Sequence, residues 1–435
     1  MNTTTICFPL RVLLMIPLVA LFHVSFTQSL TDTDPWQFSS QRPEIAPVNG
    51  IDDEIMIHDA PTLKLAGNGE KSANGCWFVN VPVKSMSWYR FKTLYKGENI
   101  AEQSRSVLAR IIWQDAEGKL VNRPEYPATL ADIDENGCSI IEQIYQVPEE
   151  AVSARIELIY RWDEDGQVNF GGTTMTLVED PGPRKVRLAT IHHRPENSSG
   201  AMQNLEEFAS FIERAARQGA DIVCLPEGAT QVGTQSNYMS ASEPLPGPSS
   251  KFLGEIAKKH KLYIVAGILE KDGSTVYNTA ILLDREGNLA GKYRKVSLPR
   301  EEIEGGVTPG DSFPVFDTDF GKVGIMICWD VSFPEAARTL AFNGAEVIMM
   351  PIWGGHLTLA KARALENQVY LVSSTYDMKS AVFDQEGEII GEASDENPVV
   401  VVEVDLNERK YWPWLGDFKN RIRREMPPQS ALQTK

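Results

Sequence analysis

The sequence of 435 residues predicts an α/β unit preceded by an antiparallel β-sandwich domain. In the α/β unit we expect two sheets with helices outside both, a four-layer α-β-β-α sandwich. Two observations predict this organisation: the residue pattern changes at a Pro/Gly break over residues 181–185, and the part after the break contains internal repeats. Hydrophobic residues make up 42% of the chain, which excludes a disordered or collagen-like protein.

Residues 1–28 are typical of a secretory signal peptide. Arg11 precedes an apolar run over residues 12–26, and this run is shorter than the roughly 20 residues that span a bilayer. An uncleaved membrane anchor is the alternative. We expect an exported protein, periplasmic or extracellular, with no stable membrane insertion after cleavage. In such a compartment Cys76 and Cys138 could form a disulfide or remain buried thiols.

Residues 30–180 are expected to form a jelly-roll-like accessory domain. Short alternating runs at 77–83, 87–91, 107–113, 154–160 and 173–178 are typical of half-buried strands in a sandwich. The last part of this region loosely resembles carbohydrate-binding modules, which implies a possible glycan contact. Trp88 or Trp113 could stack on a sugar; the alternative is that these aromatic side chains fill the core.

Residues 186–425 have an α/β pattern. Residues 186–191 predict a strand, residues 202–216 a helix, and residues 221–226 an apolar strand buried on both faces. The stretch 219–226 returns as 344–351, each time after a helix. A hairpin pattern of one Asp and two Gly also recurs, at Asp284, Gly287, Gly291 and at Asp384, Gly387, Gly391. Two repeats in the same order predict two sheets related by a pseudo-two-fold axis.

Three reactive side chains each follow a predicted strand. Glu227 comes after the strand 221–226, Lys295 after the first hairpin, and Cys328 closes an apolar strand. A cysteine nucleophile needs a base and an oxyanion donor, and the sequence has no recognisable Cys-His pattern and no G-x-S-x-G motif. Glutamate can be the base if burial raises its pKa, and lysine can stabilise the oxyanion. The three residues therefore form a self-consistent catalytic set.

These stretches resemble the nitrilase, or carbon–nitrogen hydrolase, superfamily. The resemblance covers residues 186–424 and includes Cys-Trp-Asp at 328–330, Phe-Pro-Glu at 333–335 and Ala-Arg-Ala-Leu-Glu-Asn-Gln-Val-Tyr at 362–370. It implies Glu227 as general base, Lys295 as oxyanion-stabilising lysine and Cys328 as nucleophile. The backbone N–H of Trp329 would be a second oxyanion donor. The implied reaction is covalent and uses neither a cofactor nor a metal.

The resemblance also implies a second glutamate ahead of the Pro309–Gly310 turn. Glu304 fits the spacing best, with Glu301 and Glu302 as close rivals; the alternative is a solvated acidic turn. The chain departs from many relatives at Ser297, where they have a histidine, and this puts the local hydrogen bonding in doubt.

The expected substrate is a small linear amide, hydrolysed to a carboxylate and ammonia or an amine. The alternatives are an N-carbamoyl amine or amino acid and, third, a nitrile. Arg338 is the nearest cation in sequence for the carboxylate of a carbamoyl amino acid. An acyltransferase is a further alternative, in which an amine intercepts the thioester.

The sequence gives weaker indications about macromolecular partners than about the substrate. The net charge of −17 makes nucleic acid an unfavourable partner. A glycan-binding protein with an inactive hydrolase scaffold is the rival from another class, but the retention of all three catalytic residue types argues against it. The resemblance implies a homodimer or higher homo-oligomer. The apolar cluster at residues 411–415 suits such a contact, or packing between domains.

Overall fold

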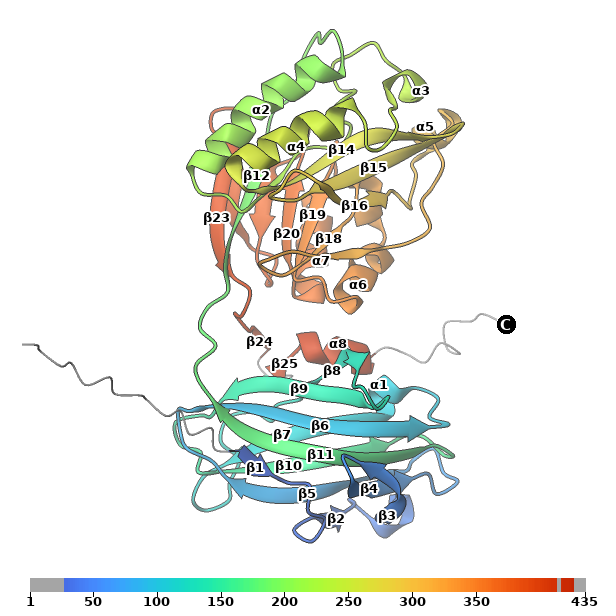
Figure 1. Ribbon diagram of the computed structural model, residues 1–435, viewed down its shortest axis with the longest axis vertical. Helices are drawn as coiled ribbons and strands as arrows, with labels where there is room; N and C mark the ends of the chain where they lie inside the picture. Colours follow the sequence, from blue (N-terminus) through green and yellow to red (C-terminus); the bar gives the residue numbers. More distant parts are fainter. Residues whose placement is uncertain (1–26, 413–415, 426–435) are drawn as a thin grey trace, which may run out of the picture.

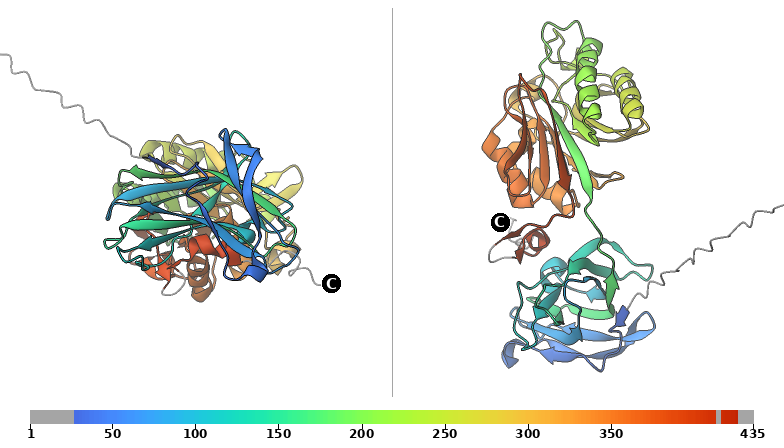
Figure 2. Two further views of the ribbon diagram at one scale, coloured as in Figure 1. Left: turned by 90° about the horizontal axis from the view of Figure 1, so that it is seen from below. Right: turned by 90° about the vertical axis from the view of Figure 1, so that its left-hand side faces the viewer.

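The computed structural model describes residues 27–412 and 416–425, which form two units (Figure 1). An all-β unit comes first, and strand β12 (Lys185–Ile191) then leads into an α/β unit. Figure 2 shows the two units from two further directions.

The expected signal peptide lies outside the described residues except for Thr27 and Gln28. These two belong to β1 (Thr27–Ser29) and pair with β11 (Gln167–Val178), so they are part of the first unit. Within the described segments, every helix is too short or too polar to cross a membrane.

The first unit consists of two antiparallel sheets. The larger has the order β3 (Val48–Ile57), β4 (Ala60–Ala66), β11, β6 (Trp88–Glu98), β9 (Ser139–Gln146) and β8 (Ala128–Ile133), with β1 beside β11. The smaller has the order β2 (Gln37–Ser39), β5 (Asn74–Pro82), β10 (Ser153–Arg161) and β7 (Val107–Gln114). The short helices η1 (Pro43–Ile45) and α1 (Gln103–Ser106) lie in connections.

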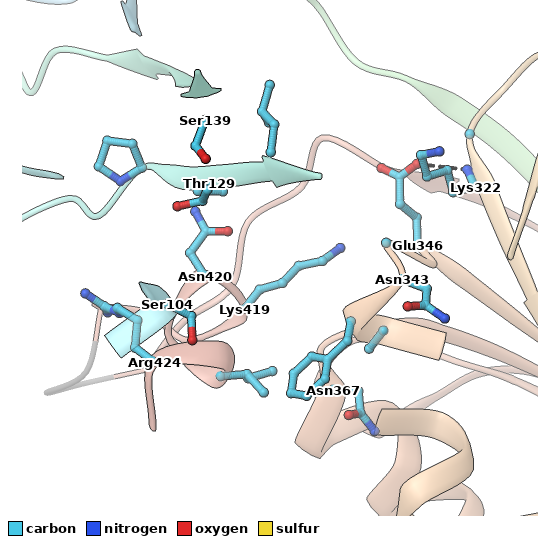
Figure 3. Close-up of a pocket in the computed structure, with 18 of the residues that line it drawn as sticks. Ser104, Thr129, Ser139, Lys322, Asn343, Glu346, Asn367, Lys419, Asn420 and Arg424 are labelled. Carbon is cyan, nitrogen blue, oxygen red and sulfur yellow. Dashed lines mark hydrogen bonds between the residues drawn. The ribbon is translucent and has the colours of Figure 1, made fainter. Parts of the chain in front are cut away.

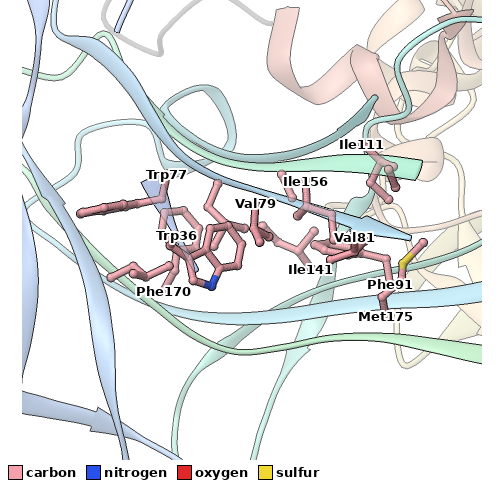
Figure 4. Close-up of a cluster of buried hydrophobic side chains, with 14 of the residues drawn as sticks. Trp36, Trp77, Val79, Val81, Phe91, Ile111, Ile141, Ile156, Phe170 and Met175 are labelled. Carbon is pink, nitrogen blue, oxygen red and sulfur yellow. The ribbon is translucent and has the colours of Figure 1, made fainter. Parts of the chain in front are cut away.

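One hydrophobic core lies between these two sheets (Figure 4). Phe91 and Phe170 come from the larger sheet, and Ile111 and Ile156 from the smaller. Trp113 belongs to the same core with 0% of its surface exposed, so it is a packing residue and unavailable for stacking on a sugar. Trp88 is half-buried.

The thiols of Cys76 and Cys138 are both free. Cys76 lies on β5 of the smaller sheet. Cys138 is buried next to the larger sheet, just before β9, and packs with Ile57 and Leu94. Cys76 and Cys138 therefore do not form a disulfide in the structure, although the sequence left that alternative open.

The second unit contains two six-stranded sheets of the same topology. The first has the order β16 (Leu289–Arg294), β15 (Thr275–Leu283), β14 (Tyr263–Asp272), β13 (Ile222–Cys224), β12 and β23 (Val399–Asp405). The second has the order β22 (Ile389–Ala393), β21 (Ser380–Phe383), β20 (Tyr370–Ser374), β19 (Val347–Pro351), β18 (Lys322–Ile325) and β17 (Val315–Asp317). In each, three parallel strands continue into an antiparallel pair, and the sixth strand closes the other edge. The α/β class expected for this half is confirmed.

Helices pack on each of these sheets. Helix α2 (Ala201–Arg217) buries Leu205, Phe208 and Ile212, an apolar stripe at helical spacing, and shares a core with α4 (Pro248–His260) and the first sheet. Helices α6 (Pro334–Phe342) and α7 (Leu357–Asn367) share a core with the second sheet. A further hydrophobic cluster contains side chains of both sheets. Ile222 and Cys224 come from the first sheet, and Ile325 and Val347 come from the second. The short helices α3 (Tyr238–Ala241), α5 (Arg300–Glu304) and η2 (Cys328–Ser332) lie in loops.

The C-terminal segment returns to the first unit. It comprises β24 (Tyr411–Trp412), β25 (Gly416–Asp417) and α8 (Lys419–Glu425), and Figure 1 shows α8 between the two units. Arg123 Nη1 donates to the Trp412 carbonyl at 2.6 Å, and the Tyr411 hydroxyl donates to Glu125 Oε1 at 3.3 Å. Tyr411 and Trp412 thus contact the first unit of their own chain; the rest of the expected apolar cluster, 413–415, lies outside the described residues.

Candidate active site

Glu227 lies at the end of β13, where the chain leaves the first sheet. Its side chain is buried, and its carbonyl accepts a hydrogen bond from the Tyr376 hydroxyl at 3.0 Å. Carboxylate Oε2 accepts the backbone N–H of Trp353 at 3.0 Å. Gly267 on β14 allows this close approach, because a Cβ at that position would lie 2.7 Å from the Glu227 Cα. The backbone around Glu227 is therefore held from several sides.

Lys295 follows β16 and lies between two carboxylates. Its ammonium is 2.8 Å from Glu227 Oε1 and 2.7 Å from Glu302 Oε1, and its side chain is 0% exposed. Asn278 on β15 donates from the same Nδ2 to both of these oxygens, at 2.7 and 2.9 Å. These four side chains form one buried network, in which one lysine and one amide link two glutamates.

The network separates the pKa values of its members. Burial opposes the charge on Lys295, but the carboxylates of Glu227 and Glu302 outweigh it and raise the lysine pKa. Burial also opposes the charge on Glu227, yet the adjacent Lys295 lowers the net pKa of this carboxyl. For Glu302 burial dominates, and the neighbouring Glu227 charge adds to it, so its pKa is raised. Lys295 and Glu227 are therefore the ionised pair of the site.

Cys328 lies after β18 of the second sheet, at the first residue of η2. Its φ of 43° lies in the left-handed region, a conformation that costs a non-glycine residue about 1–3 kcal/mol and is frequent at functional sites. Sγ lies 3.8 Å from the Gly354 carbonyl. Burial raises the pKa of the thiol to about 12, with a further contribution from the Glu227 charge and an opposing one from Lys295. The resting thiol is therefore protonated at neutral pH, and a nucleophilic role would require a base.

Asp330 ties the cysteine loop to the lysine loop. Oδ2 accepts the N–H of Ile327 at 2.9 Å and the Tyr293 hydroxyl at 2.7 Å, while Oδ1 accepts the N–H of Ser297 at 2.9 Å. The link at residue 297 uses the backbone. This hydrogen bond therefore does not depend on the side chain at position 297.

The second glutamate next to Lys295 is Glu302, which corrects the choice of Glu304. The side chain of Glu304 is 61% exposed and pairs with Arg300 at 2.6 Å. Residues 300–304 form a single helical turn, α5, so only one of its three glutamates can face inward. Glu302 is the buried one, and Glu301 and Glu304 are exposed. Spacing to the Pro-Gly turn could not determine which face of α5 points to Lys295.

The remaining predicted residues lie around the edge of the site. The Trp329 ring is 44% exposed and packs edge-to-face on Phe333, with ring centroids 6.2 Å apart. Arg338 lies on α6 over the Phe342 ring, and its pKa is lowered by burial, with Glu366 opposing this. Among the described residues, no group of three or more His, Cys, Asp or Glu side chains is arranged to hold a metal ion.

Sequence reasoning missed three groups of this site: Asn278, the Trp353 N–H and the Tyr376 hydroxyl. Asn278 stands 17 residues before Lys295 in the chain, and β15 pairs with β16, so strand pairing brings it to the network. Trp353 and Tyr376 come from the second sheet. Their sequence neighbourhoods contain no signal for this role.

Comparisons with known proteins concern the second unit of the chain. The family model for carbon-nitrogen hydrolase matches residues 185–413. The omega-amidase NIT2 of Homo sapiens is 34% identical over 249 residues, covering 51% of this chain and 89% of the relative. A nitrilase of Pyrococcus abyssi is 38% identical over 226 residues, covering 47% of this chain and 84% of the relative. The crystal structure of Saccharomyces cerevisiae Nit3, a member of branch 10 of the nitrilase superfamily, aligns with a TM-score of 0.46 at 31% identity, covering 51% of this chain and 90% of that one.

The family model covers more than half of the chain, and the curated relatives are matched over most of their own length. The chain belongs to the carbon–nitrogen hydrolase family of the nitrilase superfamily.

Proposed function

We propose that this protein hydrolyses a small linear amide through a thioester on Cys328. The observation that carries the proposal is the buried Glu227–Lys295 pair, which places an ionised carboxylate and a permanent cation beside a protonated thiol. A base for the thiol and a stabiliser for an oxyanion are the two requirements of a cysteine nucleophile.

In the proposed reaction Glu227 takes the thiol proton as Sγ attacks the amide carbon. The carbonyl π electrons move to oxygen, and Lys295 and the Trp329 N–H hold the resulting oxyanion. Glu227 then gives its proton to the departing nitrogen as the C–N bond breaks. It next takes a proton from water as the water oxygen attacks the thioester carbon. The C–S bond then breaks, Glu227 returns this proton to the sulfur, and the carboxylic acid product leaves and ionises to the carboxylate. Each oxyanion donor of this kind contributes a factor of about 10²–10³ in rate.

The preference for an amide over a nitrile rests on two unpartnered acceptors. Glu302 Oε2 and Asn278 Oδ1 are buried and accept no hydrogen bond from any described residue. An amide or carbamoyl nitrogen brings N–H donors that would satisfy such acceptors, whereas a nitrile brings none. The names of the relatives, omega-amidase and nitrilase, leave both classes open. An N-carbamoyl amine therefore remains the second candidate.

The proposed architecture is a four-layer α-β-β-α sandwich over residues 186–425, preceded by an accessory β-sandwich over residues 30–180. Three hydrophobic cores support this proposal. One lies between the first sheet and helices α2 and α4, one lies between the two sheets, and one lies between the second sheet and helices α6 and α7. The two antiparallel sheets of the first unit share a separate core.

The test is ammonia release from a panel of short linear amides, carbamoyl amines and nitriles, by wild-type protein and by Cys328→Ala. Release from amides by the wild type alone supports the proposal. Preferred turnover of carbamoyl amines supports the second candidate, and turnover of nitriles contradicts the role given to the two acceptors. Equal release by both proteins excludes Cys328 as nucleophile.

A further inference from the structure

A large cavity lies between the two units, apart from the candidate active site. It has a volume of about 1010 Å³ and is lined by residues of the first unit, of the α/β unit and of α8 (Figure 3). A second cavity of about 840 Å³ shares Arg184, Glu346, Lys419 and Asn420 with it. We call these two cavities together the interdomain cleft. Lys419 stands at the place where they meet.

Lys419 is an uncompensated cation in this cleft. Among the residues that the structure describes, its ammonium makes no hydrogen bond and no ion pair, and Figure 3 shows the side chain extending from α8 across the cavity toward Glu346. The surrounding protein lowers the pKa of this lysine by burial, only partly offset by the charges of Glu346 and Asp417. A partly desolvated ammonium without a partner is costly, and a bound anion would remove that cost.

Several other charged side chains of the cleft form ion pairs. Arg184 donates to Glu346, and Lys322 lies 2.6 Å from Asp317. Arg424, in contrast, is 7% exposed, and its Nε has no hydrogen-bond partner in the described part of the chain. Lys419 and Arg424 are therefore cations of the larger cavity that form no ion pair with a described residue. Asp180 and Asp405, which line the smaller cavity, likewise form no ion pair there and accept only backbone N–H groups.

Neutral polar groups of the cleft also lack partners. Asn367 Oδ1, Gln368 Nε2 and the Tyr145 hydroxyl are buried, line one or other cavity, and have no hydrogen-bond partner within the described segments. They include donors and an acceptor. The rest of the larger cavity's wall includes further amides and hydroxyls, namely Ser104, Thr129, Ser139, Asn343 and Asn420. Such a lining matches a ligand rich in hydroxyl groups.

We propose that the interdomain cleft binds a hydroxyl-rich organic acid, a sugar carrying a carboxylate or a phosphate, with its anionic group at Lys419 and its hydroxyls on the amides of both walls. The ligand would contact the first unit through Thr129 and Ser139 and the α/β unit through Asn343 and Asn367. Binding would therefore couple the two units at a place separate from Cys328. This gives the first unit a role in recognition without requiring an exposed aromatic platform.

The test is calorimetric titration of the full-length protein with glucuronate, glucose 6-phosphate, glucose and inorganic phosphate. We expect glucuronate or glucose 6-phosphate to bind at least about tenfold more tightly than glucose and than phosphate. One charge-assisted contact of roughly 1.4 kcal/mol corresponds to that tenfold difference. Tighter binding of glucuronate would identify the anionic group as a carboxylate, and tighter binding of glucose 6-phosphate would identify it as a phosphate.

Variants locate the site. Lys419→Gln should weaken binding of the acid about tenfold, while Lys419→Arg should retain it. Asn343→Ala, on the opposite wall, should weaken binding as well. Lys361→Gln is the matched control, because Lys361 is an exposed lysine that pairs with Glu388 away from the cleft. Without ligand, Lys419→Gln should unfold at no lower temperature than the wild type, since it removes an uncompensated charge.

Three results overturn the proposal. One is that neither acid binds, and another is that glucose or phosphate alone binds as tightly as the acids. The third is that an acid binds but Lys419→Gln leaves its affinity unchanged, which would place the ligand elsewhere.

Discussion

The two sheets of the α/β unit have the same strand order, yet different chemical groups follow their strands. In the first sheet, β13 leads to Glu227 and β16 to Lys295. In the second, β19 is the counterpart of β13 and leads to Trp353, which offers only its backbone N–H to Glu227. Cys328, the proposed nucleophile, follows β18 of the second sheet. The repeated scaffold thus places strand ends together. In the proposed mechanism, the residues at those ends divide the acid–base and nucleophilic roles between the sheets.

Replacing Cys328, the proposed nucleophile of the second sheet, should have the largest effect. We expect Cys328→Ala to lower kcat by about 10⁴–10⁶-fold, because residues that act as one unit lose nearly all of their effect together. Cys224→Ala is the control, since Cys224 is fully buried at the end of β13 and burial raises its thiol pKa. Steady-state kinetics of both variants test this. Similar losses in the two would contradict the assignment of the nucleophile.

Displacing Glu227, the proposed base of the first sheet, should have the next largest effect. Gly267→Ala would put a Cβ 2.7 Å from the Glu227 Cα, so the backbone must move. A misplacement of about 1 Å can cost about 10²-fold in rate, and we expect a loss of that size in kcat/KM. Gly50→Ala on β3 has open space around its Cβ and should leave kcat/KM unchanged. Wild-type kinetics for Gly267→Ala would show that this close approach does not position Glu227.

The inward and outward glutamates of α5 offer a sharper contrast within one helical turn. Glu302→Gln replaces the carboxyl group that accepts a hydrogen bond from the Lys295 ammonium with an amide. Hydrogen bonds to charged groups contribute about 1.5–3 kcal/mol, so we expect kcat/KM to fall roughly 10- to 100-fold. Glu304→Gln removes an exposed charge of the same turn and should have no effect. The reverse ranking of the two variants would restore Glu304 as the second glutamate.

The smallest expected effect concerns pH and stability. Burial raises the pKa of Glu302 above 4.5, so the folded protein holds this proton more tightly than the unfolded chain. The stabilisation is present below pH 4.5 and is lost as the pH rises through the raised pKa. Glu302→Gln, which does not titrate, should therefore gain stability relative to wild type between pH 4.5 and neutrality. Urea unfolding at several pH values measures this, and a constant difference would contradict the raised pKa.

The sequence predicted those parts of the molecule that depend on local patterns. The hairpin turns at Asp284 and Asp384 are an example: each aspartate Oδ1 accepts the N–H groups two and four residues later, at 2.8–3.0 Å. The repeat 219–226 and 344–351 likewise corresponds to β13 and β19, at equivalent places of the two sheets. Both features follow from residue order alone.

Features that depend on tertiary packing could not be predicted in the same way. The choice among three glutamates in α5 depends on which face of one turn meets Lys295. The burial of Trp113 depends on how two sheets pack, since alternation does not say which face is inside. The interdomain cleft depends on α8, a short C-terminal helix whose position between the units has no sequence pattern.

The most direct test of the central claim is to find the acyl group during turnover. Wild-type protein is mixed with the best linear amide, quenched in acid and digested, and its peptides are analysed by mass spectrometry. We predict a mass increase equal to the acyl group on the peptide that contains Cys328, and none in Cys328→Ala. An acyl group on any other residue, or sustained hydrolysis by Cys328→Ala, would contradict the mechanism.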